Sequence, residues 1–180
     1  MLEITVPATE MFDEVTQEFV NYKEQTLQLE HSLVSLSKWE SKWHKAFLSR
    51  REKTSEETID YIRCMTITKN VDPSVYTRLT RENVEQINKY IEDPMTAVYF
   101  PEDKRAGSSG DTVTSELIYY WMISLNIPQE YQKWHLNRLL ALIKVCNIKN
   151  SPGKKMSKSD VMRRNASLNA ARRAKMHSNG

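Results

Sequence analysis

Hydrophobic residues in the first thirty positions alternate with polar ones, as they do in strands with one buried face. Leu2, Ile4 and Val6 are each followed by a charged or polar residue or a proline, and Leu27 and Leu29 show the same alternation. A second apolar group lies between these two stretches: Phe12, Val15, Phe19 and Val20. The pattern predicts a small β element at the N-terminus.

From Ser32 onward the apolar spacing changes to three or four residues, which is the period of a helix. The residues at this spacing are Leu33, Leu36, Trp39, Trp43 and Phe47. They predict a first helix over residues 33–48, with two indoles on one stripe. A capping-box pattern, Thr54-Ser-Glu-Glu57, predicts the start of a second helix that runs to about Ile67.

The middle of the chain carries clear stop and start signals. Asp72-Pro73 predicts a short helical turn, and Thr80 predicts the N-cap of a third helix that Asp93-Pro94 ends. Residues 95–100 are β-branched and aromatic enough to predict a short strand. Residues 101–111, which contain two of the four glycines, predict a surface loop.

Three further helices are expected in the C-terminal half. Residues 117–123 are apolar on nearly every side, which predicts a central buried helix. Residues 129–146 form an amphipathic pattern after Pro128. Residues 151–153 predict a hinge, and residues 160–175 predict a last helix with few large apolar side chains.

Together these elements predict a mainly α protein of the α+β class: a multi-helix bundle with a small N-terminal β element and a basic C-terminal helix. The length of 180 residues and the hydrophobic content of 39% fit one domain with a real core. We therefore expect a helical core domain over residues 1–150 and a basic linker and helix over residues 151–180.

Charge is divided unevenly between these two parts. Residues 151–180 hold one acid, Asp160, and eight bases: Lys154, Lys155, Lys158, Arg163, Arg164, Arg172, Arg173 and Lys175. That segment is therefore +7, and subtraction from the totals of 26 bases and 23 acids leaves 18 bases and 22 acids, a net charge of −4, for residues 1–150. The expected protein is an acidic body with a basic tail.

Location and redox state follow from what the sequence lacks. No apolar run is long enough to span a bilayer, and the first residues do not resemble a signal peptide. Cys64 and Cys146 each lie in an apolar helical pattern without a second ligand residue beside them, so we expect reduced thiols in the core. The expected location is the cytoplasm of the cell that makes the protein.

The sequence offers no convincing catalytic, cofactor-binding or metal-binding pattern, so we expect a protein that is not an enzyme and has no cofactor. His31, His44 and His135 are dispersed along the chain. One string, Lys155-Met-Ser-Lys-Ser159, matches the phosphate-stabilising loop of class I aminoacyl-tRNA synthetases. That loop functions in a nucleotide-binding fold, for which the required βαβ alternation is missing here, so we interpret the string as a linker and N-cap.

Candidate partner contacts come from the aromatic stripe and the basic tail. Trp39 and Trp43 are typical either of a core or of anchors for a partner protein. Basic side chains of the tail could bind an acidic protein surface or phosphates; because aromatic residues are not interleaved with them, we expect protein rather than nucleic acid. The candidate partner-binding residues are Trp39, Trp43, Lys154, Lys155, Lys158, Arg163, Arg164, Arg172 and Arg173.

Several segments give the chain a family resemblance. These segments are Leu29-Glu-His-Ser-Leu33, Ser37-Lys-Trp-Glu-Ser41, Tyr119-Tyr-Trp-Met122, Lys133-Trp-His-Leu-Asn-Arg-Leu-Leu140 and Val145-Cys-Asn147. In them the chain resembles tail assembly chaperones of long-tailed bacteriophages. The resemblance implies a non-enzymatic protein of the host bacterial cytoplasm that binds the tape-measure protein, keeps it soluble and helps tail-tube subunits assemble around it. It also allows a homo-oligomer.

Two other functions compete with this expectation. One is a structural virion protein, such as a tail or connector subunit whose basic tail inserts into a neighbour. The other is an accessory protein that binds nucleic acid through the tail. Membrane binding is not expected.

Overall fold

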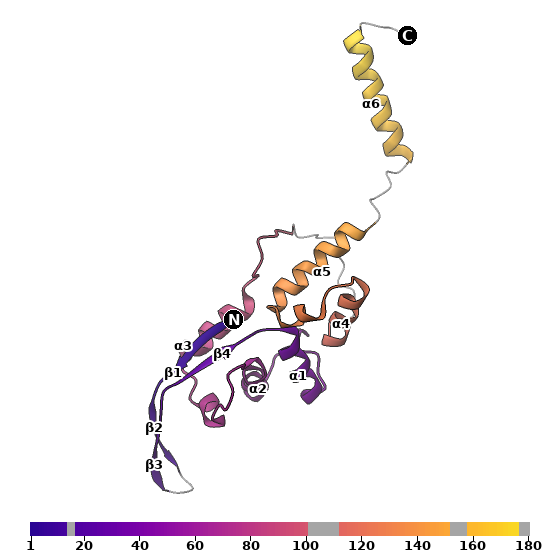
Figure 1. Ribbon diagram of the computed structural model, residues 1–180. Coiled ribbons are helices and arrows are strands. Elements are labelled where there is room, and N and C mark those ends of the chain that lie inside the picture. Colours follow the sequence, from indigo (N-terminus) through magenta and orange to yellow (C-terminus); the bar gives the residue numbers. More distant parts are fainter. Residues whose placement is uncertain (14–16, 101–111, 152–157, 177–180) are drawn as a thin grey trace. The chain divides into compact units, whose positions relative to one another are not determined.

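The computed structural model of the chain describes residues 1–13, 17–100, 112–151 and 158–176 (Figure 1). In this part of the chain most elements are helices, and all four strands lie within the first thirty residues. This confirms the mainly α, α+β class. The chain divides into two compact units, Met1–Cys146 and Asn147–Gly180. The division therefore falls a few residues before the boundary expected at residue 150.

Two antiparallel ribbons make up the β element. The strands are β1 (Leu2–Val6), β2 (Thr9–Asp13), β3 (Glu18–Tyr22) and β4 (Gln25–Leu29). β1 pairs with β4 so that Ile4 lies opposite Leu27, and both side chains are buried because alternate residues of each strand face the core. β2 pairs with β3 so that Phe12 lies opposite Phe19, but both of these rings are exposed. This second ribbon continues beyond the first (Figure 1).

Helices and helical turns follow the strands. They are α1 (Leu33–Trp43), α2 (Ser55–Met65), the 3-10 helix η1 (Pro73–Thr77), α3 (Arg81–Glu92), α4 (Ser115–Ser124), the 3-10 helix η2 (Gln129–Lys133), α5 (Leu136–Asn150) and α6 (Lys158–Met176). Thr54 and Thr80 form capping boxes at the starts of α2 and α3, as predicted. The short turn after Asp72 and the last helix, α6, are also confirmed.

α1 is shorter than the predicted helix over residues 33–48. It ends at His44, whose backbone is left-handed with φ 52°. Beyond this cap the Glu40 carboxylate accepts a hydrogen bond from the Phe47 amide at 2.8 Å, and the Phe47 ring stacks on Tyr61 with centroids 3.8 Å apart. Phe47 therefore reaches the core from a loop, not from the helical stripe.

Two hydrophobic clusters lie in the first unit, and α1 contributes to both. The first gathers the inward faces of β1 and β4 with α2, η1 and α3, and Trp39 of α1 belongs to it. The second joins Leu33 and Leu36 of α1 to α4 and α5, with Ile118 and Leu139 fully buried. The spacing of apolar residues in α1 thus serves two cores at once.

The prediction of a strand over residues 95–100 is wrong. Met95 has a positive φ of 48°, and its amide donates to the Asp93 carboxylate at 2.8 Å. Three residues later the Val98 amide donates to the Thr96 hydroxyl at 3.1 Å. Such local turns compete with strand pairing, and no described strand pairs with this segment. The surface loop predicted over residues 101–111 lies outside the described residues.

Two further helix predictions need correction. α4 buries only one face: Ile118 and Met122 are buried, whereas Tyr120 is 63% exposed and Ile123 is 76% exposed. The helix predicted over residues 129–146 is interrupted between η2 and α5. There His135 forms a β-bridge with Ser32, and this strand-like pairing replaces helical hydrogen bonds.

Candidate functional site

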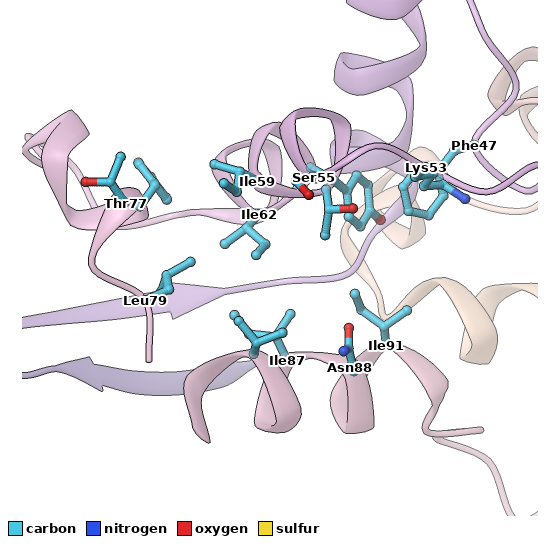
Figure 2. Close-up of a pocket in the computed structure, with 14 residues that line it drawn as sticks. Phe47, Lys53, Ser55, Ile59, Ile62, Thr77, Leu79, Ile87, Asn88 and Ile91 are labelled. Carbon is cyan, nitrogen blue, oxygen red and sulfur yellow. The ribbon is translucent and has the colours of Figure 1, made fainter. Parts of the chain in front are cut away.

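An apolar groove of about 620 Å³ opens between α2 and α3, and side chains of both helices point into it (Figure 2). This volume lies within the range of about 300–1,000 Å³ that is typical of ligand pockets. The groove is lined by Phe47, Lys53, Ser55, Thr58, Ile59, Tyr61, Ile62, Tyr76, Thr77, Leu79, Val84, Ile87, Asn88 and Ile91.

α2 supplies one wall because two of its apolar residues are three positions apart. Ile59 and Ile62 both line the groove, with Ile59 half-buried and Ile62 buried. The polar face of α2 is occupied elsewhere: Asp60 forms an ion pair with Lys42 and accepts a hydrogen bond from the Trp43 indole at 2.9 Å. α2 is thus held to α1 on one side and offers its isoleucines to the groove on the other.

α3 supplies the opposite wall in the same way. Val84, Ile87 and Ile91 recur at spacings of three and four residues, so they share one face. Other side chains tie α3 to the N-terminal ribbon: the Asn83 amide donates to the Thr5 carbonyl at 3.1 Å. The Tyr90 hydroxyl donates to the carboxylate of Glu30, which directly follows β4, at 2.6 Å. The wall is therefore anchored to the ribbon and leaves the α2-facing side open.

The two ends of the groove differ in chemistry (Figure 2). One end is formed by Thr77 and Leu79, and the other by Phe47 and Lys53. The Lys53 ammonium lies 4.3 Å from the centre of the Phe47 ring, a cation–π contact. Burial lowers the pKa of Lys53 from its ordinary value. The groove thus combines aliphatic walls with hydroxyl and amide groups at its rim and a positive charge at one end.

A buried ion-pair cluster holds the α2 wall in place. Glu57, which is 1% exposed, accepts hydrogen bonds from Lys45 at 2.8 Å, from Arg51 at 2.7 Å and from the Thr54 amide at 2.9 Å. The hydrogen bond from Lys45, with that from the Thr54 amide next, lowers the pKa of Glu57 to about 2. Glu57 is therefore ionised near neutral pH and joins the start of α2 to the preceding loop.

The two candidate tryptophans lie beside this cluster, not on an open surface. Trp39 is 1% exposed, and its indole N–H donates to the Glu57 carbonyl at 2.9 Å. Trp43 is half-buried and stacks on Trp39 with centroids 6.1 Å apart. The sequence left Trp39 as either a core residue or an anchor for a partner protein, and in the structure it is a core residue. Its indole therefore has no open face with which to anchor a partner.

The basic candidates belong to the C-terminal unit. Lys154 and Lys155 lie outside the described residues, as does most of the string over residues 155–159, and Lys158 is the first residue of α6. Four arginines are exposed on α6: Arg163, Arg164, Arg172 and Arg173. These arginines therefore share one helix of the second unit, whereas the residues that line the groove belong to the first unit.

Two histidines that the sequence shows as dispersed are neighbours in the structure. His31 and His135 lie edge to face with ring centroids 5.0 Å apart, and both are buried. His31 shares a 2.6 Å hydrogen bond with the Tyr61 hydroxyl, and His135 Nε2 lies 2.9 Å from the Tyr90 carbonyl oxygen. Burial, with the nearby His135, lowers the pKa of His31 to about 3. We interpret the pair as a neutral structural contact.

The cysteines are free thiols and both are half-buried, so no disulfide joins them. Among the described residues, no group of three or more His, Cys, Asp or Glu side chains is placed to hold a metal ion. In the same part of the chain, no helix is both long enough and apolar enough to span a membrane.

Comparisons of the chain with protein-family models, with curated proteins and with solved structures found no match. The groove is therefore interpreted from its own geometry and from the residues that form it.

Proposed function

We propose that this chain is a tail assembly chaperone of a long-tailed bacteriophage, which binds an amphipathic helix of the tape-measure protein in the groove between α2 and α3. The observation that carries the proposal is an open apolar groove on a folded core, walled by two helices whose other faces are already engaged. In this role the protein is not an enzyme and acts in the host bacterial cytoplasm.

An amphipathic helix suits this groove better than an extended peptide. α2 presents two isoleucines three positions apart, and α3 presents valine and isoleucine at three- and four-residue spacing. A third helix can pack its own i, i+3, i+4 residues between such rows. The rim hydroxyls of Ser55 and Thr58 suit the polar margins of such a helix. Lys53 at one end favours an acidic residue on the bound segment.

Chaperone activity follows from the kind of surface that is covered. A long helical protein that is not yet assembled exposes apolar surface, and such surface promotes association. A small protein that covers one helical segment, while its own charged exterior faces water, keeps the complex soluble. The resemblance of the chain to tail assembly chaperones names the tape-measure protein as the client, with tail-tube subunits as the later partners.

Co-expression tests the proposal most simply. The tape-measure protein of the same genome is expressed with the tagged chain, and the soluble fraction is recovered by pull-down in moderate salt. Asn88 is exposed and lines the groove, so Asn88→Trp fills the groove without removing a core side chain. We expect this variant to retain its melting temperature but to lose most of the soluble client.

The matched control is Lys89→Trp, which adds the same indole to the same helix at an exposed position that does not line the groove. It should recover as much client as the unaltered chain. Equal recovery with both variants would place the binding surface elsewhere, and no recovery with the unaltered chain would remove the chaperone proposal.

A structural virion subunit is the second candidate, and the ribbon of β2 and β3 favours it. Met11, Phe12 and Phe19 are 42%, 51% and 66% exposed, and such apolar side chains suit a permanent site on a neighbouring subunit. Mass spectrometry of purified particles separates the candidates, because a chaperone should be absent from finished tails and a subunit should be present in fixed copy number.

A further inference from the structure

The β2–β3 ribbon is acidic. Residues 9–22, which comprise both strands and the residues between them, contain four acids and no base, a charge of −4. Glu10 and Glu18 are exposed, and neither carboxylate forms an ion pair with another described residue. By contrast, Glu57 and Asp60 of the same unit are paired with lysines. The β2–β3 ribbon therefore offers negative charge that is not neutralised.

One face of this ribbon places a carboxylate beside two aromatic rings. Phe12 lies opposite Phe19 with ring centroids 5.2 Å apart, and Glu10 is two positions before Phe12, so all three share a face. A two-stranded ribbon alone has no second layer that could bury such rings, and both phenylalanines remain more than half exposed. This face is suited to a partner that is both apolar and positively charged.

α6 has that chemistry. Its 19 residues contain six bases and one acid, a net charge of +5, and all of its described side chains are exposed. Leu168, Arg172 and Lys175 are separated by four and then three positions, so an apolar side chain and two cations share one face. Neither Arg172 nor Lys175 forms an ion pair within the part of the chain that the structure describes.

The spacing of the two faces agrees as well. Glu10 and Phe12 are two residues apart on a strand, which is about 7 Å. Leu168 and Arg172 are four residues apart on a helix, which is about 6 Å. A helix laid along the β2–β3 ribbon can therefore pack Leu168 against the phenylalanine pair while Arg172 reaches the Glu10 carboxylate.

We propose that copies of this chain associate head to tail, with the β2–β3 ribbon of one copy bound to α6 of the next copy. Each copy carries one such ribbon and one such helix, so the two surfaces are matched in number. Because they are different surfaces, the contact is heterologous and continues to a third copy unless a ring closes. No residue of the β2–β3 ribbon or of α6 lines the groove, so this association is independent of the proposed client binding.

Other occupants suit these surfaces less well. Contact between two β2–β3 ribbons would bring together two charges of −4, and contact between two α6 helices two charges of +5, so neither surface suits its own kind. A nucleic acid could bind the bases of α6, but it would leave the phenylalanines of the ribbon uncovered.

Sedimentation velocity of the full chain after nuclease treatment tests the proposal. At about 50 mM salt the sedimentation coefficient should rise with concentration between about 1 and 100 μM, and about 500 mM salt should weaken the association at least tenfold. Glu10→Lys/Glu18→Lys alters the ribbon and Arg172→Glu/Lys175→Glu alters α6. Each double variant alone should self-associate at least about tenfold more weakly than the unaltered chain.

An equimolar mixture of these two variants should again associate, at least as a one-to-one complex. The first variant keeps the unaltered α6 and the second keeps the unaltered ribbon, so one native contact can form between them. The matched control, Glu52→Lys/Glu130→Lys, makes the same change of charge at two exposed positions of the first unit outside the ribbon and should associate like the unaltered chain.

Several results would overturn the proposal. They are a monomer at every concentration, undiminished association of either double variant alone, equal weakening in the control, and a mixture that stays monomeric. Association that disappears on nuclease treatment would also overturn it, because nucleic acid would then be the partner of α6.

Discussion

Helices α3 and α6 have similar proportions of charged residues but depend on the rest of the molecule in different ways. The apolar residues of α3 recur at the helical period, so Ile87 and Tyr90 can be buried together. Its polar side is held to the N-terminal ribbon by hydrogen bonds. In α6 every described side chain is exposed, and large apolar residues are few. The comparison shows that helical propensity can make a helix, while periodic apolar residues assign it to a core.

This difference separates two kinds of function. Because α2 and α3 are fixed by core contacts and ion pairs, the groove between them is preformed and can bind an apolar segment without large rearrangement. α6 instead offers charge on an exposed surface, where affinity depends on salt. Substitutions of buried residues in the first unit should therefore change stability, and changes in α6 should leave stability nearly unaltered.

The largest expected effect is that of removing a core indole. Trp39→Ala should lower the free energy of unfolding by about 3–5 kcal/mol, because it removes a fully buried ring and leaves a cavity. Urea denaturation followed by circular dichroism measures this change. Leu168→Ala in α6 is the matched control and should cost less than about 0.5 kcal/mol. Similar costs for the two variants would contradict the distinction between core helices and α6.

Acid should weaken the first unit through His31. In the folded state its pKa is about 3, against about 6.5 when unfolded, so the unfolded chain binds more protons between these values. Stability due to this group is complete above pH 6.5 and is lost as pH falls, by about 2 kcal/mol at pH 5. Urea denaturation at pH 8 and pH 5 measures the loss.

Two variants assign that pH dependence. His31→Gln should reduce the difference in stability between pH 8 and pH 5 by about 2 kcal/mol. His44→Asn changes an exposed histidine at a left-handed position that asparagine tolerates, and it should leave the difference unchanged. An unchanged difference in the His31 variant would show that this imidazole is not kept neutral by its surroundings.

A smaller effect is expected at the start of the groove wall. Thr54→Ala removes the side-chain oxygen that accepts from the Glu57 amide at 3.2 Å and should cost about 1 kcal/mol. Ser55→Ala, one residue further and exposed, should change stability by less than about 0.5 kcal/mol. A cost of Thr54→Ala no larger than that of Ser55→Ala would mean that the capping box does not hold α2.

The smallest effect should come from removing the C-terminal segment. A chain ending at residue 150 keeps the buried residues of both hydrophobic clusters, and its melting temperature should change by no more than about 2 °C. Differential scanning calorimetry measures this shift. A fall of about 10 °C or more would show that α6 stabilises the first unit and that the comparison with α3 is wrong.

Local signals account for most of what the sequence predicted correctly. Alternation at Ile4 and Leu27, the capping boxes at Thr54 and Thr80, and the Asp72-Pro73 turn each act over a few residues, so the elements that they start were found in place. The predictions that failed concern elements whose structure depends on partners distant in the sequence. The predicted helix over residues 129–146 is interrupted because His135 pairs with Ser32, which no local pattern reveals.

The groove illustrates the same limit. The faces of α2 and α3 that line it carry apolar residues at helical spacing: Ile59, Ile62, Val84, Ile87 and Ile91. An apolar face that packs inside and one that borders an open groove have the same period, so the sequence could not separate them. The approach of His31 to His135 likewise depends on tertiary pairing alone.

Site-specific photocrosslinking tests most directly whether the groove binds the client. A photoreactive amino acid is placed at Asn88, which lines the groove, or at Ile123, an exposed position of α4 that does not, and each full-length variant is co-expressed with the tape-measure protein. We expect a crosslinked client from Asn88 and little or none from Ile123. Crosslinking from Ile123 alone, or from neither position in a complex that still forms, would contradict this expectation.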